Sequence, residues 1–333
     1  MKTVSFGIAN YCVPCNSHCR HCLLSSCGKA TGVEYETGIV FADRVLKEIS
    51  EQRPDISGSF YIGYCMDTPK LVDYLGFCRK HDSPGARFLQ MNGFAFRSSS
   101  ELDDLMTEIK DEGVELIDLT FYGMEQYHDR FAGRKDDFNF CLRMLTAAEK
   151  INLPVNISIP LMHDNLDQMI KLREIPEIAL ASRYSYFLPH SKGRGRLLKD
   201  QRITKQEFES FPQEIRDSFW KIKHLTEAEW LSSGEIVTPE KRNLTLVLTP
   251  ENFTHYANMS ASAILNELET MDDGFTGKMP SVPELAERYG RTDNQQLYRF
   301  RDLLLRWRQE YIAETGDMIY DMHDESHNFS VHI

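Results

Sequence analysis

Three cysteines within eight residues constrain this chain more than any other feature of its sequence. Cys15, Cys19 and Cys22 are separated first by three and then by two residues. Because each sulfur lies so close to the next along the chain, one loop can bring all three onto a single metal centre. A [4Fe–4S] cluster is normally held by four thiolates, so three cysteines leave one iron free for a further ligand. The spacing therefore predicts a [4Fe–4S] cluster held by Cys15, Cys19 and Cys22.

Two more cysteines, Cys12 and Cys27, flank these three and leave another interpretation open. A closed four-sulfur zinc site would use Cys12 together with Cys15, Cys19 and Cys22. Structural zinc sites usually separate their two Cys-x2-Cys pairs by a dozen residues or more, whereas only three residues separate them here. A disulfide framework is disfavoured, because a chain of 333 residues with eight cysteines and no secretory signal does not indicate an oxidising compartment. The spacing favours iron.

The remaining cysteines do not predict a second cluster. Cys78 and Cys141 lie on apolar helical stripes, where a free cysteine usually acts as a small buried hydrophobe. All eight cysteines lie at or before Cys141, so the C-terminal half cannot hold a cysteine-ligated cluster of its own.

Length and composition indicate a soluble protein with room for one large domain and an appendage, or for two domains. Hydrophobic residues make up 41% and charged residues 26% of the chain, and no apolar run approaches the ~18 residues of a membrane span. The first residues lack the apolar region and cleavage site of a signal peptide. We therefore expect a cytoplasmic protein without a membrane partner.

The overall charge bears on possible partners. With 38 basic and 50 acidic residues, the net charge is −12. A partner bound through its phosphate backbone requires a basic face, so the composition disfavours nucleic acid.

The first 200 residues alternate between predicted strands and helices. Strands are expected at 3–9, 58–64, 86–91, 115–121, 155–161 and 184–188, with apolar helical stripes at 42–49, 71–78, 102–109, 138–145 and 166–172. Six βα repeats favour a parallel sheet curled into a barrel or part of one, with active groups at the carboxyl ends of the strands. We predict an α/β fold, a partial (β/α)6 TIM-like barrel, in which the cysteines follow the first strand.

After Lys199 the pattern becomes mainly helical. Capping-box signatures occur at 204–207, 226–229 and 281–284, a helix start at 249–250, a short apolar strand pattern at 244–248, and long amphipathic stripes at 261–268 and 297–311. We expect a barrel domain at 1–200 and a mainly helical substrate or capping region at 201–333, which covers the open side of the barrel.

Several stretches resemble one enzyme superfamily. The Cys-x3-Cys-x2-Cys spacing, with the aromatic-type residue His21 before the last cysteine, resembles the signature of radical S-adenosylmethionine (SAM) enzymes. Met91-Asn92-Gly93 is similar to the family's Thr-Asn-Gly, and Gly193-Arg194-Gly195 after Pro189 to its Pro-x-Gly-Arg turn. The run from Phe121 through His128-Asp129-Arg130 and Gly133 to Phe138 resembles a family run that begins Asp-Gly, with Tyr122 in place of the aspartate.

This resemblance covers residues 3 to 200 and is strongest to the branch of anaerobic sulfatase-maturing and peptide-modifying (SPASM or twitch-type) enzymes. This chain lacks the C-terminal cysteines that hold auxiliary clusters in that branch.

The resemblance also implies residues that bind SAM. In the family, a Gly-Gly-Glu-Pro-like turn after the second strand binds the SAM amino group; here the segment from Gly63 to Pro69 offers Asp67 in place of the glutamate. The implied cofactor-binding residues are Tyr64, Cys65, Met66, Asp67, Asn92, Tyr122 and Arg194. Two alternatives stay open: Cys65 is structural, and Arg194 belongs with Lys192 and Arg196 to a solvated basic loop.

The function that the resemblance implies is that of an anaerobic, metal-binding oxidoreductase, a radical SAM enzyme. Its [4Fe–4S] cluster would reductively cleave S-adenosyl-L-methionine to a 5′-deoxyadenosyl radical, which abstracts hydrogen from the substrate. A low-potential donor of the flavodoxin or ferredoxin type would supply the electron, and the branch favours a peptide or protein side chain as substrate.

Alternatives to this function stay open. They are a non-catalytic iron–sulfur electron-transfer or zinc-binding protein, and a radical SAM enzyme that acts on a small molecule or a nucleic acid. The sequence assigns no catalytic residue.

Overall fold

The computed structural model describes residues 1–26, 28–63, 65–219, 221–237 and 240–316. The strands are β1 (Lys2–Ala9), β2 (Ser57–Tyr61), β3 (Phe88–Gln90), β4 (Leu116–Thr120), β5 (Val155–Pro160), β6 (Arg183–Phe187), β7 (Leu225–Thr226), β8 (Lys241–Val247) and β9 (Leu297–Tyr298). The first helices are α1 (Tyr35–Gln52), α2 (Leu71–Lys80), α3 (Ser99–Asp111), α4 (Glu125–Ala132), α5 (Asp137–Lys150), α6 (Met169–Arg173) and α7 (Pro176–Ala179). The later helices are α8 (Lys205–Ser210), α9 (Gln213–Asp217), α10 (Glu227–Ser232), α11 (Pro250–Tyr256), α12 (Ala261–Lys278), α13 (Val282–Tyr289) and α14 (Phe300–Thr315). Short 3-10 helices are η1 (Pro84–Ala86), η2 (His163–Gln168) and η3 (Gly193–Gln201).

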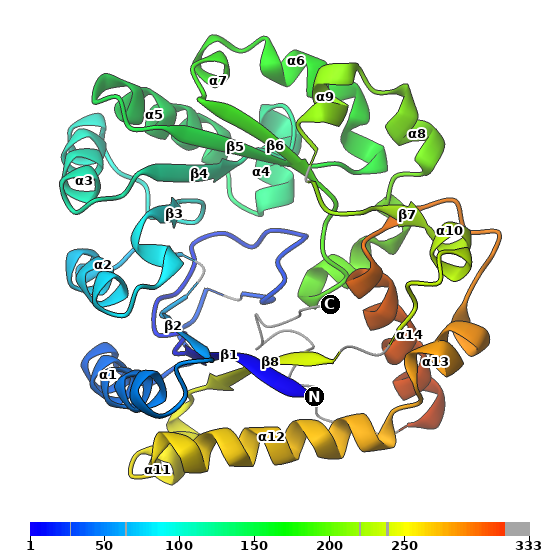
Figure 1. Ribbon diagram of the computed structural model, residues 1–333. Coiled ribbons are helices and arrows are strands. Elements are labelled where there is room, and N and C mark those ends of the chain that lie inside the picture. The colour runs from blue at the N-terminus through cyan, green and yellow to red at the C-terminus, as the bar shows by residue number, and fades with distance from the viewer. Residues whose placement is uncertain (27, 64, 220, 238–239, 317–333) are drawn as a thin grey trace.

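Parallel strands form a curved wall with helices on its outer side (Figure 1). Two sheets build this wall, with the orders β2-β1-β8 and β3-β4-β5-β6, and all neighbours within these two sheets are parallel. A further, two-stranded sheet pairs β7 with β9 in antiparallel fashion. The segment between β1 and α1, which carries the cysteines, lies inside the curve (Figure 1). The predicted α/β class with a TIM-like partial barrel is confirmed.

The alternation of side chains along the strands explains the two faces of the wall. Ile117 and Leu119 of β4 and Ile157 of β5 pack in one core with the apolar faces of α3 and α5. Because successive side chains point to opposite faces of a strand, Asp118 and Asn156 lie on the inner face. The helices therefore cover an apolar surface, while the inside of the curve is polar along these strands.

Strand β8 adds to the predicted arrangement. A strand was expected near 244–248, and the structure pairs it in parallel with β1, with Leu246 opposite Ile8. Leu244 and Leu246 share a core with Ile264 of α12 and with the buried face of α1. A segment beyond residue 200 therefore belongs to the same sheet as β1.

The outer edge of β6 is also covered by residues beyond 200. The Tyr186 N–H donates to the Ser218 carbonyl at 3.0 Å, and Tyr186 forms a parallel bridge with Phe219. The C-terminal segment then packs on the chain that follows β6, where the Ser191 N–H donates to Asp302 at 3.0 Å. Residues beyond 200 thus contact both outermost barrel strands, β6 directly and β1 through β8.

Local signals for the later helices are confirmed. Thr204, Thr226, Thr249 and Ser281 each cap the helix that follows them, in a reciprocal capping box. Cys78 and Cys141 are buried in apolar cores, as their helical stripes predicted. Among the described helices, none combines the length and the apolar character that crossing a bilayer requires.

Candidate functional site

The cysteine loop, residues 10–34, is tied to segments that follow several strands. The backbone hydrogen bonds run from Val13 N to Ile62 O (3.1 Å), Asn16 N to Gly93 O (3.0 Å), His18 N to Ala132 O (2.8 Å), Arg20 N to Phe131 O (3.0 Å) and Arg194 N to Cys22 O (2.9 Å). The partners follow β2, β3, β4 and β6 in the chain. The cysteines therefore lie where the carboxyl ends of the parallel strands converge, as predicted.

Each of the three predicted cluster cysteines accepts a hydrogen bond at its sulfur. The donors are Ser17 N to Cys15 Sγ (3.5 Å), Ser26 N to Cys22 Sγ (3.4 Å) and the Tyr122 hydroxyl to Cys19 Sγ (3.2 Å). All three cysteines are half-buried. Hydrogen bonds to the sulfurs are a recurrent feature of protein-bound iron–sulfur clusters, so this donor set fits a cluster at the three thiolates.

Cys15 has a second thiol beside it. The thiol of the buried Cys65 lies beside the Cys15 sulfur, and its proximity lowers the pKa of Cys15. The burial of Cys19 has the opposite effect and raises the pKa of that thiol to about 12. Cys65, which the sequence resemblance placed among the cofactor-binding residues, thus lies next to the cysteine loop.

Gly93 makes room for Cys15. A Cβ at this position would lie 2.3 Å from the Cys15 sulfur, and its φ of +86° is one that only glycine adopts without strain. The Asn-Gly element after β3 therefore lets the backbone approach the sulfur and accept hydrogen bonds from Asn16.

We expect Gly93→Ala to lower the amount of iron that the protein binds, because the added methyl group displaces the Cys15 sulfur. Gly113→Ala is the matched control, since Gly113 has a φ of +88° but nothing within 4 Å of an added Cβ. Both substitutions should cost about 1–2 kcal/mol of folding stability through their left-handed backbone. Iron and sulfide analysis after anaerobic reconstitution checks this, and equal iron contents in the two variants would contradict it.

Arg194 holds the cysteine loop. Its Nε donates to the Cys19 carbonyl at 2.9 Å and its Nη1 to the Ser26 carbonyl at 2.6 Å. Gly193, with a φ of +50°, permits this approach, because a Cβ there would lie 2.6 Å from the Cys22 carbonyl. The Gly-Arg turn thus contacts the cysteine loop directly, and Nη2 of Arg194 is buried without a hydrogen-bond partner among the described residues.

His21 packs within an aromatic group under the loop. Its ring centroid lies 5.2 Å from that of Tyr122, 5.7 Å from Phe131 and 6.2 Å from Phe187. Burial, together with the charge of Arg194, lowers the pKa of His21 to about 4. The imidazole is therefore neutral at pH 7 and acts as a packing residue before the last cysteine.

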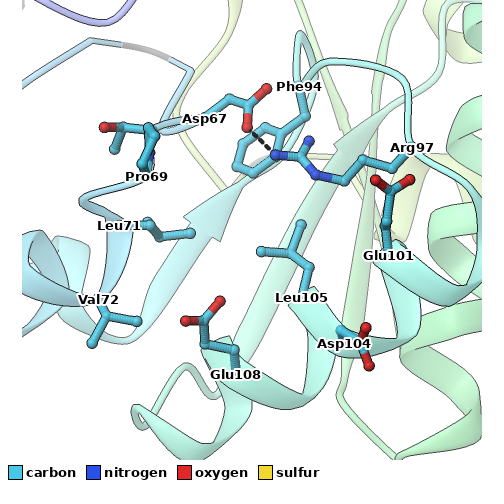
Figure 2. A pocket seen from close by; sticks show the side chains of 11 residues that line it. Asp67, Pro69, Leu71, Val72, Phe94, Arg97, Glu101, Asp104, Leu105 and Glu108 are labelled. Carbon is cyan, nitrogen blue, oxygen red and sulfur yellow. Dashed lines mark hydrogen bonds and ion pairs between the residues drawn. The ribbon is translucent and has the colours of Figure 1, made fainter.

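Asp67 lies at the edge of a cavity between α2 and α3. Figure 2 shows its carboxylate paired with Arg97, and it also accepts from the Ala95 N–H at 2.5 Å. The cavity has a volume of about 490 Å³ and combines an apolar floor that includes Leu71 and Leu105 with several acidic residues (Figure 2). The Asp67 carboxylate is thus hydrogen-bonded to the segment that follows Gly93.

The other predicted cofactor residues lie in different settings. Asn92 joins β3 to β4, because its side chain donates to the Thr120 carbonyl at 3.0 Å and accepts from the Thr120 N–H at 2.6 Å. Met66 is half-buried and packs against the cores on both sides of the gap between β2 and β3. Tyr64 lies outside the described residues, as does Cys27.

Sequence reasoning missed a polar network on the inner face of β4 and β5. One oxygen of Asp118 accepts from Ser158 Oγ at 2.8 Å and from Asn156 Nδ2 at 3.1 Å, while the other is buried without a partner among the described residues. Burial raises the pKa of Asp118 to about 6. The signal was present as polar residues at every second position of otherwise apolar strands.

A curved parallel sheet with a three-cysteine loop at its carboxyl ends defines a partial TIM-like barrel. No protein-family model matches the sequence, and no curated protein matches it either. Solved structures do match. SuiB of Streptococcus suis bound to the precursor peptide SuiA matches with a TM-score of 0.50 and 10% identity, over 73% of this chain and 58% of SuiB.

Two further matches are weaker. The structure of anSMEcpe with bound AdoMet has a TM-score of 0.43 and 16% identity, over 64% of this chain and 60% of the other. HemN of Escherichia coli is a coproporphyrinogen III oxidase described as a radical SAM enzyme. It matches with a TM-score of 0.38 and 14% identity, over 74% of this chain and 63% of HemN. The chain thus spans less than two thirds of the length of each of these three proteins. The match to SuiB shows a shared fold, so the resemblance inferred from the sequence is confirmed at the level of the fold.

Proposed function

We propose that this protein is a radical SAM enzyme that binds a [4Fe–4S] cluster through Cys15, Cys19 and Cys22. The observation that carries the proposal is the arrangement of the three sulfurs, each with a hydrogen-bond donor, at the converging carboxyl ends of a partial barrel. When bound, such a cluster supplies an electron that cleaves SAM to methionine and a 5′-deoxyadenosyl radical. The protein's own contribution is to position the ligands and to exclude water.

The residues proposed to bind SAM surround the cluster loop. Cys65 lies beside Cys15, and Arg194 has a buried guanidinium nitrogen available for a carboxylate. The side chains of Asp67 and Asn92 are engaged within the protein, so we assign to their segments a contribution through the backbone. Met66 belongs to the proposed set, and Tyr64 is retained from the sequence resemblance. Tyr122 contributes through Cys19, to whose sulfur its hydroxyl donates, and not through a contact with SAM.

The alternative zinc site is less well supported. Cys12 packs with Tyr35 and Ile39 against the core under α1, whereas Cys15 borders the core of the β3–β6 sheet. Cys19 packs in a third group, near Tyr122. These surroundings differ for Cys15 and Cys19 as well as for Cys12, so the preference for three ligands over four rests on the cysteine spacing, which is too short for two zinc-binding pairs.

For the substrate we propose a peptide or protein side chain. SuiB, which shares the fold, was solved with a precursor peptide, and the polar inner face around Asp118 and Asn156 offers hydrogen-bonding groups inside the barrel. Residues beyond 200 cover both outermost barrel strands, so we propose that this region forms the substrate or capping domain. A cytoplasmic location and a flavodoxin- or ferredoxin-type electron donor belong to the same proposal.

The test is an anaerobic assay of the full chain. Reconstituted protein should hold about four irons and four sulfides, as one cubane does, and with dithionite it should convert SAM to methionine and 5′-deoxyadenosine. An electron-transfer protein would hold the same cluster but would leave SAM intact. Stoichiometric zinc in place of iron, or a reduced cluster without SAM cleavage, would contradict the proposal.

A further inference from the structure

Tyr122 contributes a hydrogen-bond donor to a cluster cysteine. Its hydroxyl lies 3.2 Å from the Cys19 sulfur, and the residue is only 1% exposed, so water does not compete for this bond. The position is the one at which the resembled family run carries an aspartate. A carboxylate ionised at neutral pH only accepts hydrogen bonds, whereas a phenol can donate one. This chain therefore brings a donor to a place where that run would bring a negative charge.

The orientation of Tyr122 is fixed by the protein. Its backbone N–H donates to Nδ1 of His128 at 3.3 Å, and its carbonyl accepts from Asn165 Nδ2 at 2.9 Å. Its ring centroid lies 4.6 Å from that of Phe131. The hydroxyl thus points to Cys19 because both backbone groups and the ring are held.

His128 is held in turn by Asp137, which forms an ion pair with Arg134. Because Nδ1 accepts from Tyr122, Nε2 carries the proton and donates to Asp137 at 3.2 Å. The Asp137 carboxylate pairs with Arg134 at 3.3 Å, and its side chain is 2% exposed. His128, Asp137 and Cys141 also lie close enough together for a metal ion, but these hydrogen bonds account for the first two of them.

We propose that Tyr122 is a positioning residue that raises the reduction potential of the cluster held by Cys15, Cys19 and Cys22. The proposal rests on the function proposed above. Reduction adds one negative charge to the cluster and its thiolates, and a donor at the sulfur stabilises that charge. The site excludes water at the hydroxyl, so the stabilisation is not shared with solvent. Tyr122 sets the potential through Cys19 and does not take part in the reaction.

The experiment compares Tyr122→Phe with the wild-type protein, both reconstituted anaerobically. Phenylalanine keeps the ring packing and removes only the donor. The variant should keep its iron and sulfide content, while its equilibrium constant for one-electron reduction falls about tenfold, which corresponds to about 59 mV. A redox titration followed by electron paramagnetic resonance measures the potential, and the spectrum of the reduced cluster should change as well.

Tyr74→Phe is the matched control. Tyr74 is 2% exposed and its hydroxyl donates to the Phe60 carbonyl at 2.9 Å, in the core between α2 and β2. This variant loses a buried hydrogen bond of the same kind but should keep the wild-type potential and spectrum.

Two results would overturn the inference. One is a wild-type potential in Tyr122→Phe with full iron content. The other is loss of iron from Tyr122→Phe while Tyr74→Phe retains it, because the hydroxyl would then serve to retain the cluster. A wild-type protein without a [4Fe–4S] cluster would instead contradict the proposed function, and the iron analysis distinguishes that case.

Discussion

Replacing Cys15 with alanine is expected to remove the iron–sulfur cluster and with it all cleavage of SAM. Cys15 supplies one of only three thiolates, and a cluster held by two would lose a further ligand in addition to its open position. The iron content after reconstitution should fall from about four per chain to near zero. Cys78→Ala is the control, because it removes a fully buried thiol from a core that contains none of the three predicted cluster cysteines.

Two outcomes would contradict this prediction. A Cys15→Ala protein that retains four irons would show that another residue, for example Cys65 beside it, holds the cluster. Loss of iron from Cys78→Ala to the same extent would show that any loss of a core thiol disrupts assembly. Both are read by iron and sulfide analysis together with the visible absorption of the cluster.

Much of the barrel could be predicted because strands and helices leave different periods in the sequence. Apolar residues at every second position marked β4 and β5, and the stripes at 102–109 and 138–145 marked α3 and α5. The partner of β8 could not be predicted in this way. Its alternation gives a strand, but pairing with β1 depends on contacts across more than 230 residues of chain.

In the candidate site, too, local features could be predicted from the sequence, whereas contacts between distant segments could not. The spacing of Cys15, Cys19 and Cys22 is local, so the cluster loop was visible in the sequence. The contacts that surround it join distant segments, such as Tyr122 with Cys19 and Arg194 with Cys22. A motif indicated that Arg194 belongs to the site, but only the structure gives its hydrogen bonds to the loop carbonyls.

Removing the chain after Lys199 is expected to unfold the barrel, in addition to removing the region that covers its outermost strands. Strand β1 would lose its parallel partner β8, and the core on the outer side of β1 would lose Leu244, Leu246 and the buried face of α12. The exposed edge of β1 would then offer unpaired backbone groups for aggregation. We expect the truncated protein to lack a cooperative unfolding transition in circular dichroism and to bind little iron.

A point substitution tests the structural role of β8 without removing the segment. Arg242 of β8 is 6% exposed at its side chain and pairs with Asp272 of α12 at 3.2 Å and with Glu269 at 3.5 Å. Breaking such a buried pair costs about 3–5 kcal/mol, so Arg242→Ala should lower the free energy of unfolding in urea by that amount. Arg288→Ala breaks an exposed pair with Glu314 and should cost about 0–1 kcal/mol. Equal losses in the two variants, or a truncated protein that folds and binds a full cluster, would show that β8 is not required for the barrel.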